Sequence, residues 1–549
     1  MLSGEAGMGV QLDLADIQGN VLTAYGKLGF PKGRCLLLNI VDGRAGRTLL
    51  DLVRPYVTTA LRWPSTKDAP KPGAVFQKRP QVAVNLAFTF WGLLALGVPI
   101  RSLRGMPDEF IDGMPARADI LGDNFPKPIE QAWDEVWLWR EDPKRRVHVL
   151  VTLNAQMNPD GTPVAELDAL TRLIEGHVAA TQGGVLLLSG HRGADPRWQD
   201  LSALLERQAD GTAQPLPTEH FGFLDAIGDP VFAGQHEASK MAERVRGQGK
   251  LLPDQRWAPL ATGEFLLGHP DESQEIAGAP MPLDFSRNGT FIAYRKLHQN
   301  VAAFRDAIDR MAVAFAGVMQ MPHHEACETL RAKIAGRWSD RVPLIQAPDY
   351  AAWQAVRQRR AEAARQGDAA TLAALDRALV DFTFRDDPHG AKCPFGSHLR
   401  RSNTRDMMDP LLASPDPKQW NGSVLNNRRR ILRRGLPYGA APPDATGDDA
   451  EHGIVLLATC ASLFRQFEFV QQQWMQYGLD FNAGNDTCPI IGNHGEAAKF
   501  VIAADPAGDK PPFICDRLPQ FVETRGGEYF FVPSMTALRM IAAGIVDPT

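Results

Sequence analysis

Residues 393–406 constrain this chain more than any other stretch, because they place one histidine and three arginines in a single turn-rich segment. The segment reads CPFGSHLRRSNTRD, with the histidine at position 398. A neutral imidazole can ligate a transition metal, and arginines hold carboxylates through charge-assisted hydrogen bonds. Haem needs both an axial ligand for its iron and cations for its propionates. The fold is therefore expected to bring this turn to a cofactor site, with His398 as the metal ligand.

The composition describes an ordinary globular chain. It has 549 residues, 44% hydrophobic and 22% charged, a length that allows about two to four domains. Net charge is −5 and no long basic block occurs, so nucleic acid is not expected as a partner. The six cysteines are scattered without a C-x-x-C pair, which indicates neither a zinc site nor a disulfide framework. The adjacent His323 and His324 match no ligand spacing and are expected at the surface or in a helix cap.

Two segments bear on membranes and compartment. The first 14 residues hold no basic region followed by an apolar core, so they do not resemble a signal peptide, and a reducing cytoplasm is expected. Residues 82–100 carry no charge over 19 positions, near the length of a membrane-spanning helix. However, the first nine of them alternate as a strand does, and Gly92, Gly97 and Pro99 interrupt the remainder. We expect a buried strand and a short helix there, and no membrane span.

Strand and helix periodicities occur in both halves of the chain. Helical spacing appears at 167–174 and again at 301–308. Residues 351–381 are rich in alanine and arginine, with one glycine and no proline, and are expected to form an exposed helical insertion. Strands that return over helices give α+β layers, here in two domains. The stretches typical of strands are 147–153, 183–188, 290–294 and 454–458.

The histidine segment resembles the proximal-histidine motif of the dye-decolourising (DyP-type) haem peroxidases, which runs roughly C-P-x-x-[AS]-H-[IL]-R-R-x-N-P-R. The sequence departs from it once, with Thr404 where proline is usual, a change that loosens a turn and removes no ligand. The resemblance implies an α+β fold of two ferredoxin-like domains with antiparallel sheets flanked by helices. It places an N-terminal domain at 1–235 and a haem-binding domain at 236–549, with the helical insertion near 351–381. It covers roughly residues 14–543 and is closest to the larger members.

A second segment, 221–230, resembles the family's distal G-x-x-D-G stretch. Asp225 matches the aspartate, while Ala226 replaces the glycine. A carboxylate near the iron can take a proton from one peroxide oxygen and return it to the other. If the backbone needs a positive φ at Ala226, alanine costs roughly 1 kcal/mol or more. The resemblance implies that Asp225 is the catalytic acid–base group.

A third segment, 428–439, resembles the family's R-I-L-R-R-G-x-x-Y stretch. By this match Arg433 is the distal arginine, which stabilises negative charge on the departing oxygen. Arginine suits that role because it stays protonated at any relevant pH. Arg434 is the competing candidate, one residue away. Some of the other arginines of the cluster are expected at a basic strand edge or in a solvated charge run.

The cofactor implied by the resemblance is haem b, iron protoporphyrin IX. His398 is its expected iron ligand, and Arg401 and Arg405 are expected at its carboxylates. Glu468 lies among aromatic positions of segment 465–474. It is a candidate to accept the second N–H of the His398 imidazole, and pairing with Arg465 or with solvent is an equal alternative.

The implied activity is a peroxidase that reduces hydrogen peroxide and oxidises phenolic or dye-like donors through a ferryl intermediate. Its partners are then hydrogen peroxide and an organic electron donor, and the sequence leaves open whether the chain forms a homo-oligomer. Two rivals remain at this point: a protein that removes iron from haem, and a haem-binding or storage protein with a silent distal side. Ala226 favours the storage protein, whereas Asp225 and Arg433 oppose it.

Overall fold

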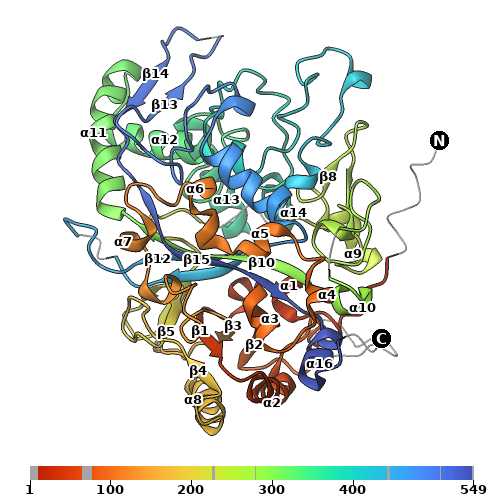
Figure 1. Cartoon of the computed structure of the whole chain (residues 1–549). Helices are drawn as coiled ribbons and strands as arrows, with labels where there is room; N and C mark the ends of the chain where they lie inside the picture. Colours follow the sequence, from red (N-terminus) through yellow and green to blue (C-terminus); the bar gives the residue numbers. More distant parts are fainter. Residues whose placement is uncertain are drawn as a thin grey trace.

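One antiparallel sheet of nine strands crosses the middle of the molecule (Figure 1). The computed structural model describes residues 10–64, 77–224, 229–277, 280–441, 445–506 and 508–546. The strand order is β11-β12-β10-β15-β2-β3-β1-β4, and β5 also pairs with β1. The strands of this sheet are β1 (Lys32–Ile40), β2 (Val82–Phe88), β3 (Val149–Ala155), β4 (Val185–Leu187), β5 (Trp198–Ser202), β10 (Thr290–Gln299), β11 (Leu432–Tyr438), β12 (Gly453–Cys460) and β15 (Val522–Val532).

The sheet consists of two halves with the same internal order. In the N-terminal half β1 lies between β3 and β4, with β2 outside β3. In the C-terminal half β10 lies between β12 and β15, with β11 outside β12. Each half therefore has the order second, third, first, fourth, as in a ferredoxin-like unit. The halves join where β15 pairs with β2 through Phe531 and Phe88. The predicted fold class is confirmed, and the proposed boundary near residue 235 stays a prediction.

The uncharged stretch at 82–100 forms a buried strand and a short helix, as predicted. Every residue of β2 is buried, because this strand lies at the centre of the sheet and is covered on both faces. Helix α3 (Phe90–Ala95) comes next, with Thr89 accepting a hydrogen bond from the Gly92 backbone N–H at its start. In the part of the chain that the structure describes, no helix has the length and apolar character needed to cross a membrane.

Helices cover both faces of the sheet (Figure 1). The N-terminal half places α2 and α8 on one face, and the C-terminal half places α11 to α13 on the other. The longer helices are α2 (Gly43–Val53), α8 (Ala165–Ala180), α9 (Ala238–Arg244), α11 (Val301–Met319), α12 (His323–Ala335), α13 (Tyr350–Gln366), α14 (Ala369–Ala378) and α16 (Met535–Ala543). The small hairpins are β6–β7 (Leu204–Arg207 and Ala213–Leu216), β8–β9 (Lys250–Leu251 and Trp257–Ala258) and β13–β14 (Lys499–Ile502 and Phe513–Asp516).

The insertion at 351–381 is helical and mostly exposed, as the sequence predicts. It forms α13 and α14, separated at Gly367, whose φ of +66° lies in the left-handed region that favours glycine. Asp349 and Asp368 begin the two helices by accepting hydrogen bonds from backbone N–H groups three residues on. The insertion therefore folds by local signals.

A second hydrophobic core lies under α11 and α12 and holds the histidine segment. Its buried members include Phe304, Trp338, Leu399, Trp474 and Cys488. The short helix α15 (His398–Ser402) packs against α12 and against the π-helical segment η9 (Val470–Met475). Burial in this core positions the candidate site.

Candidate active site around His398

The turn that carries His398 is held in place by contacts of its buried neighbours. His398 is the first residue of α15, and Ser397 before it is extended and fully buried. Arg400 fixes the turn by donating hydrogen bonds to both the backbone carbonyl and the carboxylate of Asp387. The same carboxylate accepts the backbone N–H groups of Lys392 and Cys393, each at 2.9 Å. The turn is thus fixed by a buried ion pair, although Nε and Nη1 of Arg400 have no partner among the described residues.

The imidazole of His398 is neutral and has one nitrogen engaged. Its pKa is lowered to about 3, chiefly because burial disfavours the charged form and further because Arg337, Arg433 and Arg401 are nearby cations. Nδ1 lies 3.2 Å from the Cys488 Sγ. No group among the described residues hydrogen-bonds to Nε2. A neutral ring with this arrangement can ligate a metal through Nε2.

Arg401 is bound to the protein backbone. Its Nε donates to Gly396 O at 3.0 Å, Nη1 to Trp474 O and Tyr477 O at 2.9 and 2.8 Å, and Nη2 to Asp486 O at 2.9 Å. Four of the five donors of this guanidinium are used. These donors tie α15 to the loops around it, and the expectation that Arg401 holds a haem carboxylate stays a prediction.

Arg405 has the opposite character, since its donors are buried and partly unmatched. Its Nη1 donates to Phe382 O at 2.6 Å, and the guanidinium stacks on the Phe382 ring. The Nε and Nη2 atoms are buried without a partner among the described residues. Burial lowers the pKa of Arg405 to about 9. A buried cation with orphaned donors is costly, so this residue fits an anionic group such as a haem carboxylate.

Glu468 is buried, and its partners differ from both expectations. The carboxylate receives two hydrogen bonds from Arg117, at 2.9 and 2.7 Å, and one from the Tyr529 hydroxyl at 2.8 Å. It therefore forms a bidentate ion pair with a residue 351 positions away. The prediction that Glu468 accepts from His398 is corrected, because Cys488 occupies that position against Nδ1. Pairing with Arg465 is corrected as well.

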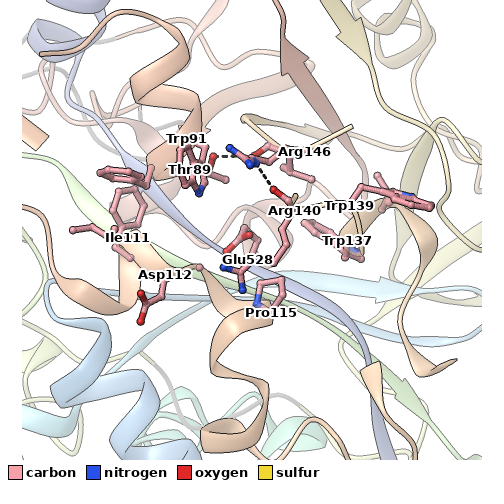
Figure 2. Close-up of a pocket in the computed structure, with 15 residues that line it drawn as sticks. Thr89, Trp91, Ile111, Asp112, Pro115, Trp137, Trp139, Arg140, Arg146 and Glu528 are labelled. Carbon is pink, nitrogen blue, oxygen red and sulfur yellow. Dashed lines mark hydrogen bonds between the residues drawn. The ribbon is translucent and has the colours of Figure 1, made fainter. Parts of the chain in front are cut away.

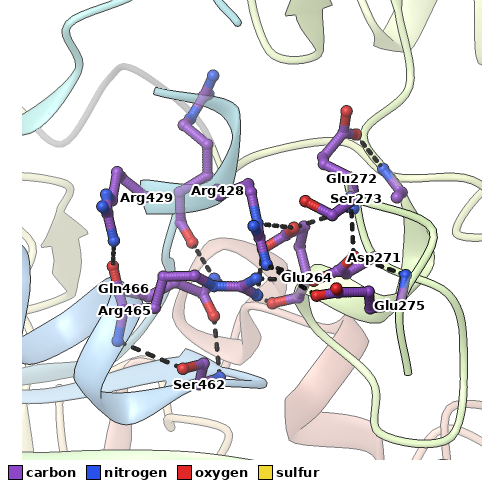
Figure 3. A network of polar contacts seen from close by, with 12 residues as sticks. Glu264, Asp271, Glu272, Ser273, Glu275, Arg428, Arg429, Ser462, Arg465 and Gln466 are labelled. Carbon is purple, nitrogen blue, oxygen red and sulfur yellow. Dashed lines mark hydrogen bonds and ion pairs between the residues drawn. The ribbon is translucent and has the colours of Figure 1, made fainter. Parts of the chain in front are cut away.

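Arg465 instead belongs to an ionic network with Arg428 (Figure 3). Arg465 donates to Asp271 Oδ2 at 2.7 Å and to Glu264 Oε2 at 2.9 Å, and Arg428 donates to the same Asp271 oxygen at 2.8 Å. Both carboxylates are fully buried. The network joins three segments at 264–275, 428–429 and 462–466, which lie far apart in the sequence.

The first three arginines of the 428–434 cluster have partners within the protein. Arg428 binds buried acids, Arg429 donates to Arg465 O at 2.5 Å, and Arg430 points to the carbonyls of Gly249 and Gln248. These three arginines bind protein groups, in place of the strand edge or solvated charge run expected for some of the cluster.

Strand alternation separates the last two arginines of the cluster. On β11, Leu432, Arg434, Leu436 and Tyr438 are buried, whereas Arg433 points to the other face and is exposed. Arg434 donates to the Asp229 carboxylate at 2.6 Å and to Asn20 O and Val21 O at 2.7 and 2.8 Å. The geometry thus favours Arg433 over Arg434 as the arginine that reaches a ligand.

Asp225 and Ala226 lie outside the described residues, but both flanks of their segment are anchored. Leu224 donates its backbone N–H to Ser339 O at 3.1 Å. Asp229 accepts the backbone N–H of Arg433 at 3.0 Å. Leu224 therefore lies beside the loop after α12, and Asp229 lies beside the candidate distal arginine.

The proximal segment keeps a specific contact where it departs from the motif. Thr404 is buried, and its hydroxyl accepts a hydrogen bond from the Asn426 side chain at 2.5 Å. Proline offers no such acceptor at its side chain. The threonine therefore ties the proximal segment to the loop that precedes the arginine cluster.

Three residues of the site gave no signal in the sequence. Cys488 contacts His398, Arg337 acts on its charge, and Asp229 pins the arginine strand. Asp229 lies inside the matched distal segment, but nothing in the sequence connects it with Arg433 and Arg434, more than 200 positions away. Cys488 and Arg337 match no motif, and only packing brings them to the histidine.

A separate cavity lies in the N-terminal half, away from His398 (Figure 2). Its wall contains Trp91, Trp137, Trp139, Arg146 and Glu528. Arg146 stacks on Trp91 with 4.1 Å between guanidinium carbon and ring centroid. The Glu528 carboxyl accepts two backbone N–H groups through one oxygen, and burial raises its pKa to about 7. None of the predicted site residues that the structure describes lines this cavity.

The chain is similar over nearly its whole length to dye-decolorizing peroxidases. It is 26% identical to Peroxidase 2 of Mycetinis scorodonius, covering 97% of this chain and 88% of that protein. It is 25% identical to a dye-decolorizing peroxidase of Mycena epipterygia, with 97% and 87% covered. Among solved structures, an ancestral D-type dye-decolorizing peroxidase superposes with a TM-score of 0.69 at 24% identity, covering 96% of this chain and 99% of that one. No family model matches the sequence.

Fold and site together give two ferredoxin-like halves and a neutral histidine, His398, that is the candidate iron ligand. Over nearly its whole length the chain is similar to the larger DyP-type peroxidases, a haem-dependent class.

Proposed function

We propose that this protein is a haem b peroxidase that reduces hydrogen peroxide and oxidises phenolic or dye-like donors. The carrying observation is the neutral His398 imidazole, with Nδ1 against Cys488 and Nε2 unengaged by the described residues, within electrostatic range of Arg433. A solved relative with a TM-score of 0.66 and 23% identity holds 2,6-dimethoxyphenol, which supports phenols as the donor class. Haem bound at this site supplies the iron centre at which peroxide is cleaved and from which electrons are drawn.

The side chains of this protein then have separate tasks. We assign His398 Nε2 to the iron and the orphaned Nε and Nη2 donors of Arg405 to a haem carboxylate. We assign Asp225 to move a proton from the near to the far oxygen of peroxide, so that the far oxygen leaves as water. Arg433 stabilises the negative charge that develops on that oxygen. Two donor molecules each supply one electron to complete the cycle.

Rapid mixing of haem-loaded protein with one equivalent of peroxide tests this function. We expect a millisecond change in the Soret band, followed by oxidation of 2,6-dimethoxyphenol with a two-to-one stoichiometry to peroxide. A haem spectrum that ignores peroxide would support storage instead, and release of iron-free porphyrin would support iron removal.

His398→Ala and Asp225→Ala divide the site by role. We expect the first to lose stable haem binding, and the second to retain haem while peroxide cleavage slows. Full haem occupancy in His398→Ala contradicts the ligand assignment, and unchanged kinetics in Asp225→Ala remove that residue from the mechanism.

We also propose a cytoplasmic location, because all six cysteines are unpaired in the structure. Cell fractionation tests this, and recovery in an oxidising compartment would contradict it.

A further inference from the structure

Helices α11 and α12 bring three metal-ligating side chains together, and none of the three belongs to the active site described above. Asp309 lies on α11, and His323 and Cys327 lie on α12. Residues four apart on a helix share one face, so the histidine and the cysteine of α12 are neighbours. The two helices pack against each other, which supplies the aspartate from the second element.

The separations of the three side chains fit one metal ion. Cys327 Sγ lies 3.5 Å from Asp309 Oδ1 and 3.8 Å from His323 Nδ1. One ligand atom of each residue lies within 4.8 Å of the others. Tetrahedral zinc with ordinary bond lengths places its sulfur about 3.6 Å from its oxygen or nitrogen ligands. Only small side-chain adjustments are needed to close the site.

We propose that Asp309, His323 and Cys327 form a zinc site, with water as the fourth ligand. One thiolate, one imidazole and one carboxylate are the donor types that zinc accepts, and three protein ligands leave one position open. Asp309 and His323 are exposed and Cys327 is half-buried, so an ion can enter from solvent. The scattered cysteines suggested no zinc site because the third donor lies on a different helix.

The surroundings of Cys327 disfavour its thiolate form in the metal-free protein. Its pKa is raised to about 11, first by burial and then by the hydrogen bond and charge of Asp309 and the charge of Glu328, while Arg331 opposes them. At neutral pH the metal-free thiol stays protonated, and zinc must displace that proton. The neighbouring Arg310 donates to Arg517 O at 3.1 Å, and no ion pair between it and Asp309 occurs among the described residues.

Equilibrium dialysis of the full-length, haem-loaded protein against Zn²⁺ tests the site, with bound metal counted by elemental mass spectrometry. We expect one zinc per chain. Cys327→Ser, His323→Gln and Asp309→Asn should each weaken binding by more than the roughly 10–100-fold that loss of an outer-shell partner costs. His324→Gln is the matched control, because His324 packs edge-on against the Tyr350 ring instead. Equal affinity in the control and the three variants overturns the proposal.

Thiol labelling gives a second readout that does not depend on peroxidase activity. The other five cysteines are buried, so a maleimide should label Cys327 first, as located by peptide mass spectrometry. Zn²⁺ should slow this labelling in the His324→Gln control and not in His323→Gln. Labelling of Cys327 that ignores zinc overturns the proposal. Because the three ligands have no part in the haem site, peroxide turnover should be the same in all variants.

Discussion

The imidazole of His398 contacts the thiol of Cys488, with Nδ1 3.2 Å from Sγ. Burial raises the pKa of this thiol, so it is neutral. A neutral sulfur is a weak hydrogen-bond partner, and it makes the imidazole less electron-rich than a carboxylate does. The candidate iron ligand is therefore held by a weaker acceptor than Glu468 would be.

Cys488→Asp should lower the ferric/ferrous reduction potential of the haem-loaded protein, because a carboxylate makes the imidazole a stronger donor to iron. We expect a shift of at least about 59 mV, a factor of ten in this one-electron equilibrium. Spectroscopic redox titration measures it, and Cys488→Ser is the size-matched control. Equal reduction potentials in Cys488→Asp and Cys488→Ser would show that the side chain at position 488 does not affect the reduction potential through His398.

Glu468→Ala should destabilise the fold while leaving haem bound. It breaks a buried ion pair and leaves Arg117 without its main partner, at a cost of about 3 kcal/mol. Denaturant unfolding of the haem-free and haem-loaded protein measures this loss of stability. Glu468→Gln should lose less stability, because it retains an acceptor oxygen. Loss of haem without loss of stability would instead support Glu468 as the hydrogen-bond partner of His398.

Arg433→Leu should affect peroxide cleavage, whereas Arg434→Leu should affect the stability of the fold. Arg433 is exposed on its strand, so its loss should slow peroxide cleavage by about 10²–10³-fold with little change in stability. Arg434 is buried against Asp229 and two backbone carbonyls, so its loss should destabilise the fold by about 3 kcal/mol. Stopped-flow kinetics and thermal unfolding separate the two outcomes, and the reverse pattern would exchange their roles.

Glu528→Gln should stabilise the protein at pH 8 and have little effect at pH 4. The folded-state pKa of Glu528 is about 7, above its unfolded value, so the stability it contributes is present below about pH 4.5 and is lost as pH rises through 7. Both hydrogen bonds end on one oxygen, which glutamine keeps. We expect a gain of about 2 kcal/mol at pH 8. Parallel pH profiles of wild type and variant would contradict the raised pKa.

His191→Phe should flatten the acid side of the stability profile. Burial, and then Lys296, lowers the pKa of His191 to about 3, and both ring nitrogens lack partners among the described residues. Between about pH 6.5 and 3 the unfolded state binds a proton that the folded state does not, so stability falls as pH falls. Replacing the titratable imidazole should reduce this slope by about 1.4 kcal/mol per pH unit. Unfolding measured from pH 4 to 8 checks it, and an unchanged slope would mean that the ring protonates in the folded state.

The sequence by itself determined several elements and singled out His398 as the candidate iron ligand. The alternation at 82–90 specified β2, the alanine-rich insertion specified α13 and α14, and the motif at 393–406 specified the turn of His398. These features are readable because periodicity, caps and motifs act over a few neighbouring residues.

Only the tertiary structure decided the partners of the buried polar groups. Arg117 binds Glu468 across 351 positions, Cys488 reaches His398 across 90, and Asp309 joins Cys327 from another helix. A buried charge or polar atom takes whichever partner the packing brings within hydrogen-bond distance, because leaving it unpaired is costly. That choice depends on how distant segments pack, and no short stretch of sequence encodes it.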